Sequence, residues 1–272
     1  FNIIEEIIKM KTPYLINLCS NWLNNEIEEQ YSKDGYHNYG TLQNISLNLP
    51  RYAYLSKDED KFFEVLRNKI NICSGILIKK FEIIKKRLKS NHLPLCSSTL
   101  NNQQPLFKLE DQNLALNFVG LNETVKFLTD YELHEQSEAF NFGKKIVKKI
   151  KEICSEMSEK DKKRYTLQEN VSNKVIYRFA QLDLKHFPKF AIPQISKKGS
   201  HYTNFTQFRE SIKMNLYEML YRQGKFNEII QNNRVISRIS LKNIKKKSHQ
   251  ELKEFIKKVC INSKIACLKF YS

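Results

Sequence analysis

Apolar side chains recur at three- and four-residue steps through one unbroken stretch in the first third of the chain. They are Phe62, Leu66, Ile70, Cys73, Leu77, Phe81, Ile84 and Leu88. This spacing places them on one face of an α-helix and predicts a helix over about Asp58–Lys89. Ser56, with Glu59 three residues later, has the pattern of a capping box at its start. A helix with a single apolar face needs other elements to cover that face.

Helical and extended patterns alternate through the rest of the chain. Further helices are predicted over about Glu135–Met157, Phe205–Gln223 (ended by Gly224) and Gln250–Asn262 (with Ser248 and Glu251 as a second capping box). Strands are predicted over Tyr14–Leu18, Leu42 with Asn44–Leu49, Val235–Leu241 and Ile265–Phe270, and irregular segments over Pro94–Lys108 and Asp183–Ser200. Strands that alternate with helices indicate a helix-rich α/β fold.

Charge is the main compositional feature. Lys and Arg number 46 against 29 Asp and Glu, a formal net charge of +17, which attracts nucleotides, nucleic acids and anionic membranes. The chain is also rich in Lys, Asn and Ile, a bias that an AT-rich genome produces by itself. The charge is therefore weak evidence of function.

Cysteine usage and hydropathy bear on where the protein works. The six cysteines are scattered without a CxxC pair or zinc spacing, and Cys73, Cys154 and Cys260 lie on apolar helix faces, as buried reduced thiols do. Reduced thiols indicate a cytoplasmic protein. No run of apolar residues is long enough for a membrane helix, so we expect no membrane partner. The first residue is Phe1, which suggests a piece of a longer, split or processed product.

Four segments combine predicted strand ends or loops with small polar groups, where α/β proteins place ligands. They are Gly40–Tyr54, Asn117–Glu123, Tyr177–Asp183 and His201–Asn204. By contrast, Asp58, Glu59 and Asp60 open a helix, where acids stabilise the helix dipole. Phosphate-binding loops of the Walker and GxGxxG kinds and the GxSxG nucleophile motif are missing from the sequence.

In their order, these segments resemble the large catalytic subunit of anaerobic (class III) ribonucleotide reductases. The matching stretches are Lys11–Tyr14 with Ile16 and Asn17, Leu47–Arg51, Leu109–Asp111, Phe118–Glu123, Leu133–Glu135 and Tyr202–Asn204. The resemblance implies a ten-stranded α/β barrel of the glycyl radical enzyme type, with a loop inserted into its centre. Residues 1–272 would then be a single domain that corresponds to the C-terminal part of this barrel.

The resemblance also implies a site and a reaction. The family reduces ribonucleotides to deoxyribonucleotides for DNA replication: a glycyl radical oxidises a cysteine on the central loop, and the thiyl abstracts hydrogen from the ribose. Asn48 is similar to a substrate-facing asparagine of the family. The other substrate-binding residues implied are Asn17, Gly120, Asn122, Glu123, Thr203 and Asn204.

Three departures from the family pattern weaken the expectation of catalysis. Gln30 stands about where the radical cysteine is expected, and Cys19, the one nearby thiol, is either a displaced catalytic residue or a structural one. Asn170–Ile176 replaces a loop suited to phosphate contact. The sequence stops at Ser272, ahead of the family's four-cysteine zinc site and glycyl radical loop. We therefore expect this chain to hold no metal and no cofactor.

Three functions stay open. In the first, the chain is a component of an anaerobic ribonucleoside-triphosphate reductase and is inactive alone. Its partners would be a nucleotide, a chain carrying the glycyl radical and zinc domain, and a radical SAM activase. A homodimer is a further partner to consider. Alternatively, it is a degenerate relative without catalysis, or a non-catalytic basic subunit or nucleic-acid-binding protein. Against the last, the sequence shows no aromatic-interleaved basic motif.

Overall fold

A parallel three-stranded sheet forms the centre of the larger part of the molecule. In the computed structural model, β2 (Thr41–Asn48), β3 (Asn113–Val119) and β4 (Arg164–Leu167) are hydrogen-bonded in that order. The structure describes residues 14–16, 40–99, 107–169, 172–195, 200–209, 211–230, 235–240, 249–265 and 267–271. All three strands run the same way, so helices return the chain from β2 to the start of β3 and from β3 to the start of β4.

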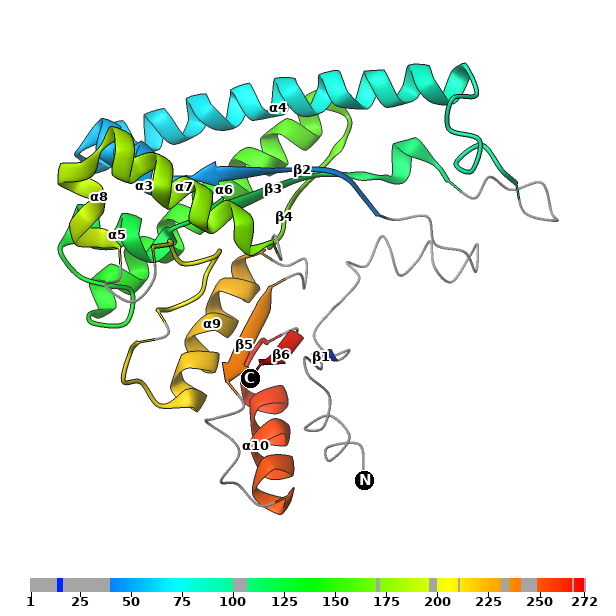
Figure 1. The fold of residues 1–272 in the computed structure, drawn as a ribbon. Helices are drawn as coiled ribbons and strands as arrows, with labels where there is room; N and C mark the ends of the chain where they lie inside the picture. Colours follow the sequence, from blue (N-terminus) through cyan, green and yellow to red (C-terminus); the bar gives the residue numbers. More distant parts are fainter. Residues whose placement is uncertain are drawn as a thin grey trace.

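The helix α4 (Glu59–Lys89) lies along the sheet in Figure 1, as the apolar stripe predicts. Phe62, Leu66 and Ile70 are fully buried in the core on its inner side. The predicted capping box names the wrong N-cap residue. The side chain of Asp58, not that of Ser56, accepts the Lys61 N–H at the N-cap, and Ser56 belongs to the preceding helix α3 (Leu49–Ser56).

Four further helices complete this part of the molecule. They are α5 (Leu121–Thr129), α6 (Ser137–Asp161), α7 (Asn173–His186) and α8 (Pro188–Gln194). Figure 1 shows α3, α5, α7 and α8 gathered at the end of the sheet to which the strands point, while α6 runs alongside it. Ligand sites of parallel sheets form at this end.

A second, smaller sheet is built from segments at both ends of the chain. Here β6 (Cys267–Tyr271) lies between β5 (Ile236–Ser240), with which it is parallel, and β1 (Tyr14–Ile16), with which it is antiparallel. Helices α9 (Leu216–Ile230) and α10 (His249–Asn262) accompany it. Leu220, Ile239, Leu252, Val259, Ile265, Leu268 and Phe270 form its separate core.

Two predictions about the second half of the chain are wrong. The third helix was expected over Phe205–Gln223 but spans Leu216–Ile230, so Gly224 lies inside the helix and does not end it. A Cβ at Gly224 would lie 2.9 Å from the Lys264 backbone nitrogen, which explains a glycine there by close approach. Asp183–Ser200, expected to be irregular, contains the end of α7 and all of α8.

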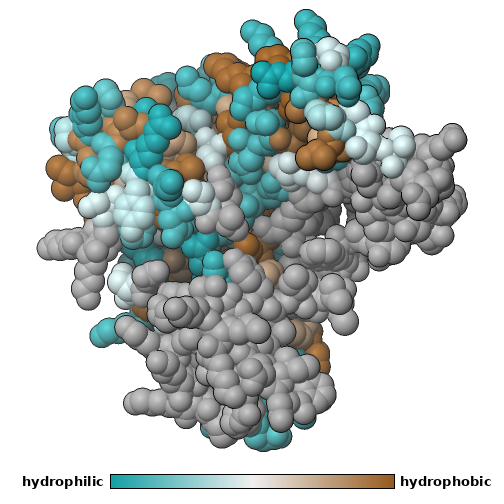
Figure 2. Space-filling view, turned by 45° about the vertical axis from the view of Figure 1, so that its right-hand side comes forward, coloured by the Kyte–Doolittle hydropathy of each residue, from teal (hydrophilic) through white to brown (hydrophobic). Residues whose placement is uncertain are grey.

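The helix-rich α/β class is confirmed, whereas the described residues form two three-stranded sheets and do not close a barrel. Of the cysteines expected in the core, Cys154 is buried, and Cys73 and Cys260 are half-buried. Within the described ranges, no helix is long and apolar enough to cross a membrane. On the face seen in Figure 2, apolar and polar side chains are interspersed in small patches.

Candidate functional site

The sheet β2–β3–β4 has one apolar face and one polar face. Strand alternation directs Leu47, Leu114, Leu116, Phe118 and Leu167 into the core beneath α4 and α6. The opposite face is mostly polar and carries Asn44, Ser46 and Asn48 of β2, Asn113 and Asn117 of β3, and Thr166 of β4. At its carboxyl end, Val119 packs against Ile176, Ala180 and Tyr202; the rest of the face does not suit packing against an apolar layer.

Much of the polar face is enclosed, yet several of its atoms have no partner. Asn117 is fully buried and donates to the Ser46 hydroxyl over 3.1 Å. Within the described part of the chain, Asn44 Oδ1, Asn48 Oδ1, Asn117 Oδ1 and Thr166 Oγ1 are buried without a hydrogen bond. Each such group costs about 1–3 kcal/mol unless a partner satisfies it. The face therefore favours a polar occupant, either water or a ligand rich in hydrogen-bond donors.

Asp183, on α7, organises the end of this face. It is fully buried and accepts hydrogen bonds from Asn48 Nδ2 (2.9 Å), Arg51 Nε (2.6 Å) and the Tyr202 hydroxyl (3.0 Å). Arg51 Nη2 lies 2.5 Å from Asp183 Oδ1, so the buried charge is paired. Because a carboxylate only accepts, the amide nitrogen of Asn48 must face Asp183, and its oxygen points away as an acceptor.

Two tyrosine hydroxyls extend the Asp183 cluster. Tyr54 and Tyr202 are buried, and their hydroxyl oxygens lie 3.2 Å apart. Burial raises the pKa of both phenols, and the nearby Asp183 carboxylate raises them further. Both groups stay protonated, so Tyr202 remains able to donate to Asp183.

The sheet splits beyond the middle of β3, and a loop takes the place of β4. Gln168, just after β4, donates its N–H to Leu116 O. Further along β3, Phe205 N–H donates to Phe118 O, Gly120 N–H donates to Thr203 O, and Val119 forms an antiparallel bridge with Asn204. The chain thus diverges at the carboxyl end of a parallel sheet, where crevices form.

Glu123, on α5, anchors this loop. Its carboxylate accepts the Thr203 N–H (3.1 Å) and the Thr203 hydroxyl (2.6 Å), and Arg209 Nη2 lies 3.7 Å away. Burial raises the pKa of Glu123, an effect that Arg209 partly offsets. Arg209 also pairs with Glu132 at 3.3 Å. Glu123 therefore holds the loop backbone in place through Thr203.

A second buried carboxylate, Glu169, follows β4. Glu169 Oε1 accepts from Asn204 Nδ2 (3.0 Å), Gln207 Nε2 (2.8 Å) and Arg238 Nη2 (3.1 Å), while Oε2 accepts the Ile236 N–H (2.9 Å). Burial raises its pKa to about 7 although Arg238 opposes the shift. This carboxylate joins the end of the first sheet to β5 of the second.

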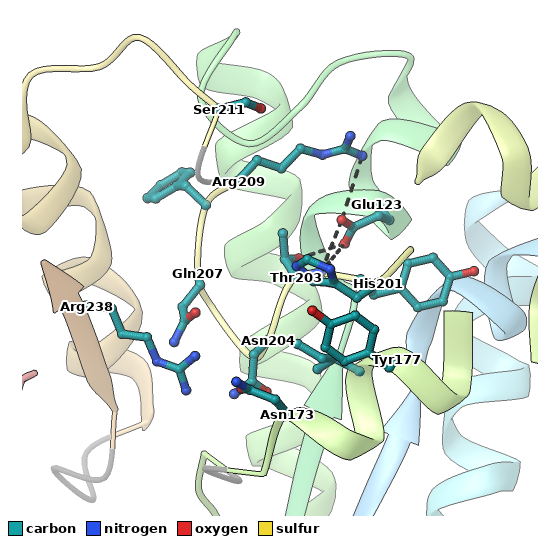
Figure 3. Close-up of a pocket in the computed structure, with 13 residues that line it drawn as sticks. Glu123, Asn173, Tyr177, His201, Thr203, Asn204, Gln207, Arg209, Ser211 and Arg238 are labelled. Atoms are coloured by element: carbon teal, nitrogen blue, oxygen red, sulfur yellow. Dashed lines mark hydrogen bonds and ion pairs between the residues drawn. The ribbon is translucent and has the colours of Figure 1, made fainter. Parts of the chain in front are cut away.

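A cavity of ≈ 440 Å³ lies between these anchors. Figure 3 shows Glu123 and Arg209 on one side, Arg238 of β5 on the other, and the loop carrying Thr203, Asn204 and Gln207 between them. Tyr177 and His201 add an aromatic pair whose ring centroids lie 4.7 Å apart. The wall thus offers both charges, amides and aromatic faces, a mixture suited to a polar molecule with a planar part.

Of the residues expected to bind substrate, the structure brings Gly120, Glu123, Thr203 and Asn204 together at the split of the sheet. Asn48 lies in the neighbouring Asp183 cluster. Asn122 is connected to these residues only indirectly: its amide donates to Glu132, which pairs with Arg209, and its oxygen accepts the Leu133 N–H. The predictions for Asn17, Cys19 and Gln30 lie outside the described residues.

Sequence reasoning missed the roles of Asp183, Glu169, Arg209 and Arg238. Asp183 ends the segment Tyr177–Asp183, one of the four candidate ligand segments. Nothing in the sequence pattern showed that it would contact Asn48, 135 positions earlier. Glu169 directly precedes Asn170–Ile176, the stretch compared with a phosphate loop, and lies between the end of β4 and the start of α7 at Asn173. Among the described residues, no group of three or more His, Cys, Asp or Glu side chains could hold a metal ion, so they offer no zinc site.

Comparison with known proteins gives a consistent match. A sequence profile described as anaerobic ribonucleoside-triphosphate reductase matches residues 1–271. The anaerobic ribonucleoside-triphosphate reductase of Haemophilus influenzae is 26% identical over 197 residues, which cover 69% of this chain and 27% of that protein.

Solved structures show the same fold. The anaerobic ribonucleotide reductase of Thermotoga maritima with glycerol in the active site superposes with a TM-score of 0.72 at 20% identity, covering 86% of this chain and 37% of that one. Its complex with dATP and CTP gives 0.71 at 19% identity, with 85% and 37% covered. The chain therefore spans about a quarter to two fifths of these relatives.

Proposed function

The chain belongs to the anaerobic ribonucleoside-triphosphate reductase family, and we propose that it forms the part of a reductase barrel that holds a ribonucleotide. In this proposal, residues 1–272 correspond to the C-terminal part of a ten-stranded barrel. The polar face of β2–β3–β4 would be part of the barrel's inner wall.

The polar sheet face is the observation that supports this function best. A barrel that encloses apolar side chains needs none of these amides, whereas one that encloses a nucleotide needs oriented hydrogen-bonding groups. Asn48 Oδ1 is buried and lacks a partner within the described residues, and Asp183 fixes its direction. A sugar hydroxyl is a donor that would satisfy this acceptor.

Two neighbouring regions divide the work of binding in this proposal. Asn48 and Asn117 would meet the ribose from the sheet. The cavity lined by Thr203, Asn204, Tyr177 and His201 would bind another part of the nucleotide. The positive charges of Arg209 and Arg238 would partly neutralise the negative charge of the nucleotide. Glu123 and Asp183 act indirectly, because their oxygens are occupied by Thr203 and by Asn48, Arg51 and Tyr202.

Catalysis is not proposed for the chain by itself. Radical reduction needs a thiol in contact with the ribose, and none of the described cysteines lines the cavity. A glycyl radical, when supplied, would provide the hydrogen-abstracting chemistry. We propose that a partner carrying it, together with a radical SAM activase, is required for turnover.

Nucleotide binding to the purified chain tests the proposal. Titration calorimetry with CTP and ATP should show saturable binding. Asn48→Ala should weaken that binding by about tenfold, the worth of one hydrogen bond of about 1–1.5 kcal/mol. Asn68→Ala, on the exposed side of α4, should leave it unchanged. Absence of saturable binding to either nucleotide by the folded wild-type chain would refute the proposal.

A turnover assay separates a working component from a degenerate relative. The chain is combined, under strict anoxia, with a glycyl-radical-bearing partner and its activase. Deoxyribonucleotide formation that requires this chain would establish a component. Nucleotide binding without turnover in the complete mixture would establish a scaffold that kept binding and lost catalysis.

A further inference from the structure

Three large apolar side chains are exposed in a row on the outer side of α4. Ile72, Ile76 and Ile83 are 57%, 43% and 51% exposed. They stand four and seven residues apart, which is the spacing of a single helix face. The other large apolar side chains that are exposed among the described residues occur one to an element. Single exposed apolar side chains are normal, whereas a row of them is a feature of interaction surfaces.

This outer row is separate from the stripe that packs on the sheet. Leu66, Ile70 and Leu77 are fully buried on the inner side of α4. At about 100° per residue, the outer row lies roughly 120° round the helix from them. Figure 1 shows α4 at the outer edge of the molecule, with the sheet and the other labelled helices to one side of it. The helix thus has two apolar faces, and its own fold buries one of them.

Basic side chains border the outer row on both sides. On the same helical geometry, four of them lie within about 60° of its centre line, whereas Glu64 and Glu82 lie about 100° away. The four are Lys69, which is half-buried, and Lys79, Lys86 and Arg87, which are exposed. Within the described residues, the ion pairs of α4 involve Lys61, Arg67 and Glu59 and leave these four cations without an acidic partner.

These charges decide which partner suits the row. In an antiparallel pair of two α4 helices centred between Ile72 and Ile76, Lys69 of each copy would face Lys79 of the other, and like charges repel. Helices that bind anionic membranes have a wider apolar face that includes aromatic side chains, and the outer row consists of three isoleucines. A partner helix with its own apolar row and flanking carboxylates matches both the row and its charges.

We propose that the outer face of α4 docks an acidic amphipathic helix of another protein chain. Apolar side chains of the partner at heptad spacing would pack between the three isoleucines, and its carboxylates would pair with the four cations. From Lys69 to Arg87 the face is about 27 Å long, so it would take about five turns of a helix. The face lies across the sheet from the polar face, because α4 covers the apolar side. The proposal therefore does not depend on what the cavity binds.

A designed peptide tests the proposed docking. The probe is a labelled four-heptad peptide with leucines in one row and glutamates beside them, whose mutual repulsion keeps it monomeric. Fluorescence anisotropy with the wild-type chain should show saturable binding. The double variant Ile72→Gln with Ile76→Gln should weaken it by about tenfold or more, because two central apolar contacts are lost. Lys79→Glu should weaken it several-fold.

Matched controls lie on α10, where Ile261 and Lys257 are also exposed. Ile261→Gln and Lys257→Glu should leave peptide binding unchanged, and circular dichroism checks that every variant is folded. A peptide with lysines in place of the glutamates should bind about tenfold more weakly or less. Absence of saturable binding to the acidic peptide, or binding that is insensitive to the isoleucine variant, would overturn the proposal.

Two further measurements test the other occupants. Sedimentation velocity reports self-association, and flotation with vesicles of phosphatidylcholine and phosphatidylserine reports membrane binding. The double isoleucine variant should match the wild type in both. Self-association that this variant abolishes would assign the outer face to a second copy of the chain, and vesicle binding that it abolishes would assign the face to a membrane. Either result would overturn the proposal.

Discussion

Asp183 shows how much one residue can determine at this site. A fully buried carboxylate is costly unless its charge is paired and its oxygens are hydrogen-bonded, and Asp183 meets both conditions through Arg51, Asn48 and Tyr202. The same contacts orient the Asn48 amide. The stability of this cluster and the direction of the Asn48 amide oxygen therefore depend on a single side chain.

We expect Asp183→Asn to lower the free energy of unfolding by about 3 kcal/mol, because Arg51 is left without its partner. The matched control is Glu156→Gln, which breaks the exposed pair of Glu156 with Arg67 and should cost about 0–1 kcal/mol. Urea unfolding of both variants measures the difference. Equal losses would show that the Asp183 cluster contributes no more than a surface ion pair.

The raised pKa of Glu169 predicts an unusual dependence of stability on pH. Its pKa rises from 4.5 to about 7 on folding, so between these values the folded state binds more protons than the unfolded state. The contribution of Glu169 to stability is thus fully present below about pH 4.5 and is lost as the pH rises to about 7. The unfolding free energy of the wild type minus that of Glu169→Gln should fall across this window, measured by thermal or urea unfolding. A difference that is flat with pH would contradict the raised pKa.

The turns that join strands to helices position the residues of the site. At Gly120, one of these turns packs very closely against a neighbouring helix. Gly120 connects β3 to α5 with a φ of 77°, a conformation that favours glycine. A Cβ there would lie 2.6 Å from Pro50 Cδ of α3. The close approach of α3 and α5 brings Asn48 and Glu123 to the same end of the sheet.

We expect Gly120→Ala to reduce stability by about 2–3 kcal/mol or more, because a left-handed residue is strained and the Pro50 ring must move. Gly75→Ala is the opposite case. Gly75 is exposed within α4, and a Cβ there meets nothing within 4 Å. Replacing it should raise stability by about 0.5–1 kcal/mol, since alanine suits a helix interior better. The same urea series measures both, and a loss at Gly75 would contradict the open space beside it.

At the scale of the whole molecule, charge is the feature that favours another function. A net charge of +17 attracts any polyanion, and Lys79, Lys80, Lys86, Arg87 and Lys89 are exposed at the end of α4. Attraction of this kind is non-specific, and it is weakened by salt.

We therefore expect weak binding to duplex DNA that does not depend on sequence and falls steeply between about 50 and 200 mM salt. Fluorescence anisotropy with two unrelated duplexes measures this, and CTP at saturating concentration serves as a competitor that should displace little DNA. Tight binding to one duplex that resists salt would favour the nucleic-acid function over the reductase family's substrate.

Local patterns in the sequence determined the elements with strong periodicity. The stripe from Phe62 to Leu88 predicted α4, alternation predicted β2, and the capping-box pattern of Ser248 and Glu251 indicated α10. A strand was also predicted where β5 lies. The family was also evident from the order of short motifs. Such features depend on neighbours within a few residues, so the sequence displays them directly.

Only the tertiary structure decided which distant groups meet. The strand Asn113–Val119 is buried along its whole length and follows a loop, so its pattern was missed. Gly224, which resembles a helix end, lies inside α9 because Lys264 packs against it. Asp183 with Asn48, and Glu169 with Arg238, are pairs separated by 135 and 69 positions. Burial and pairing set the chemistry of these acids, and both arise only when the chain is folded.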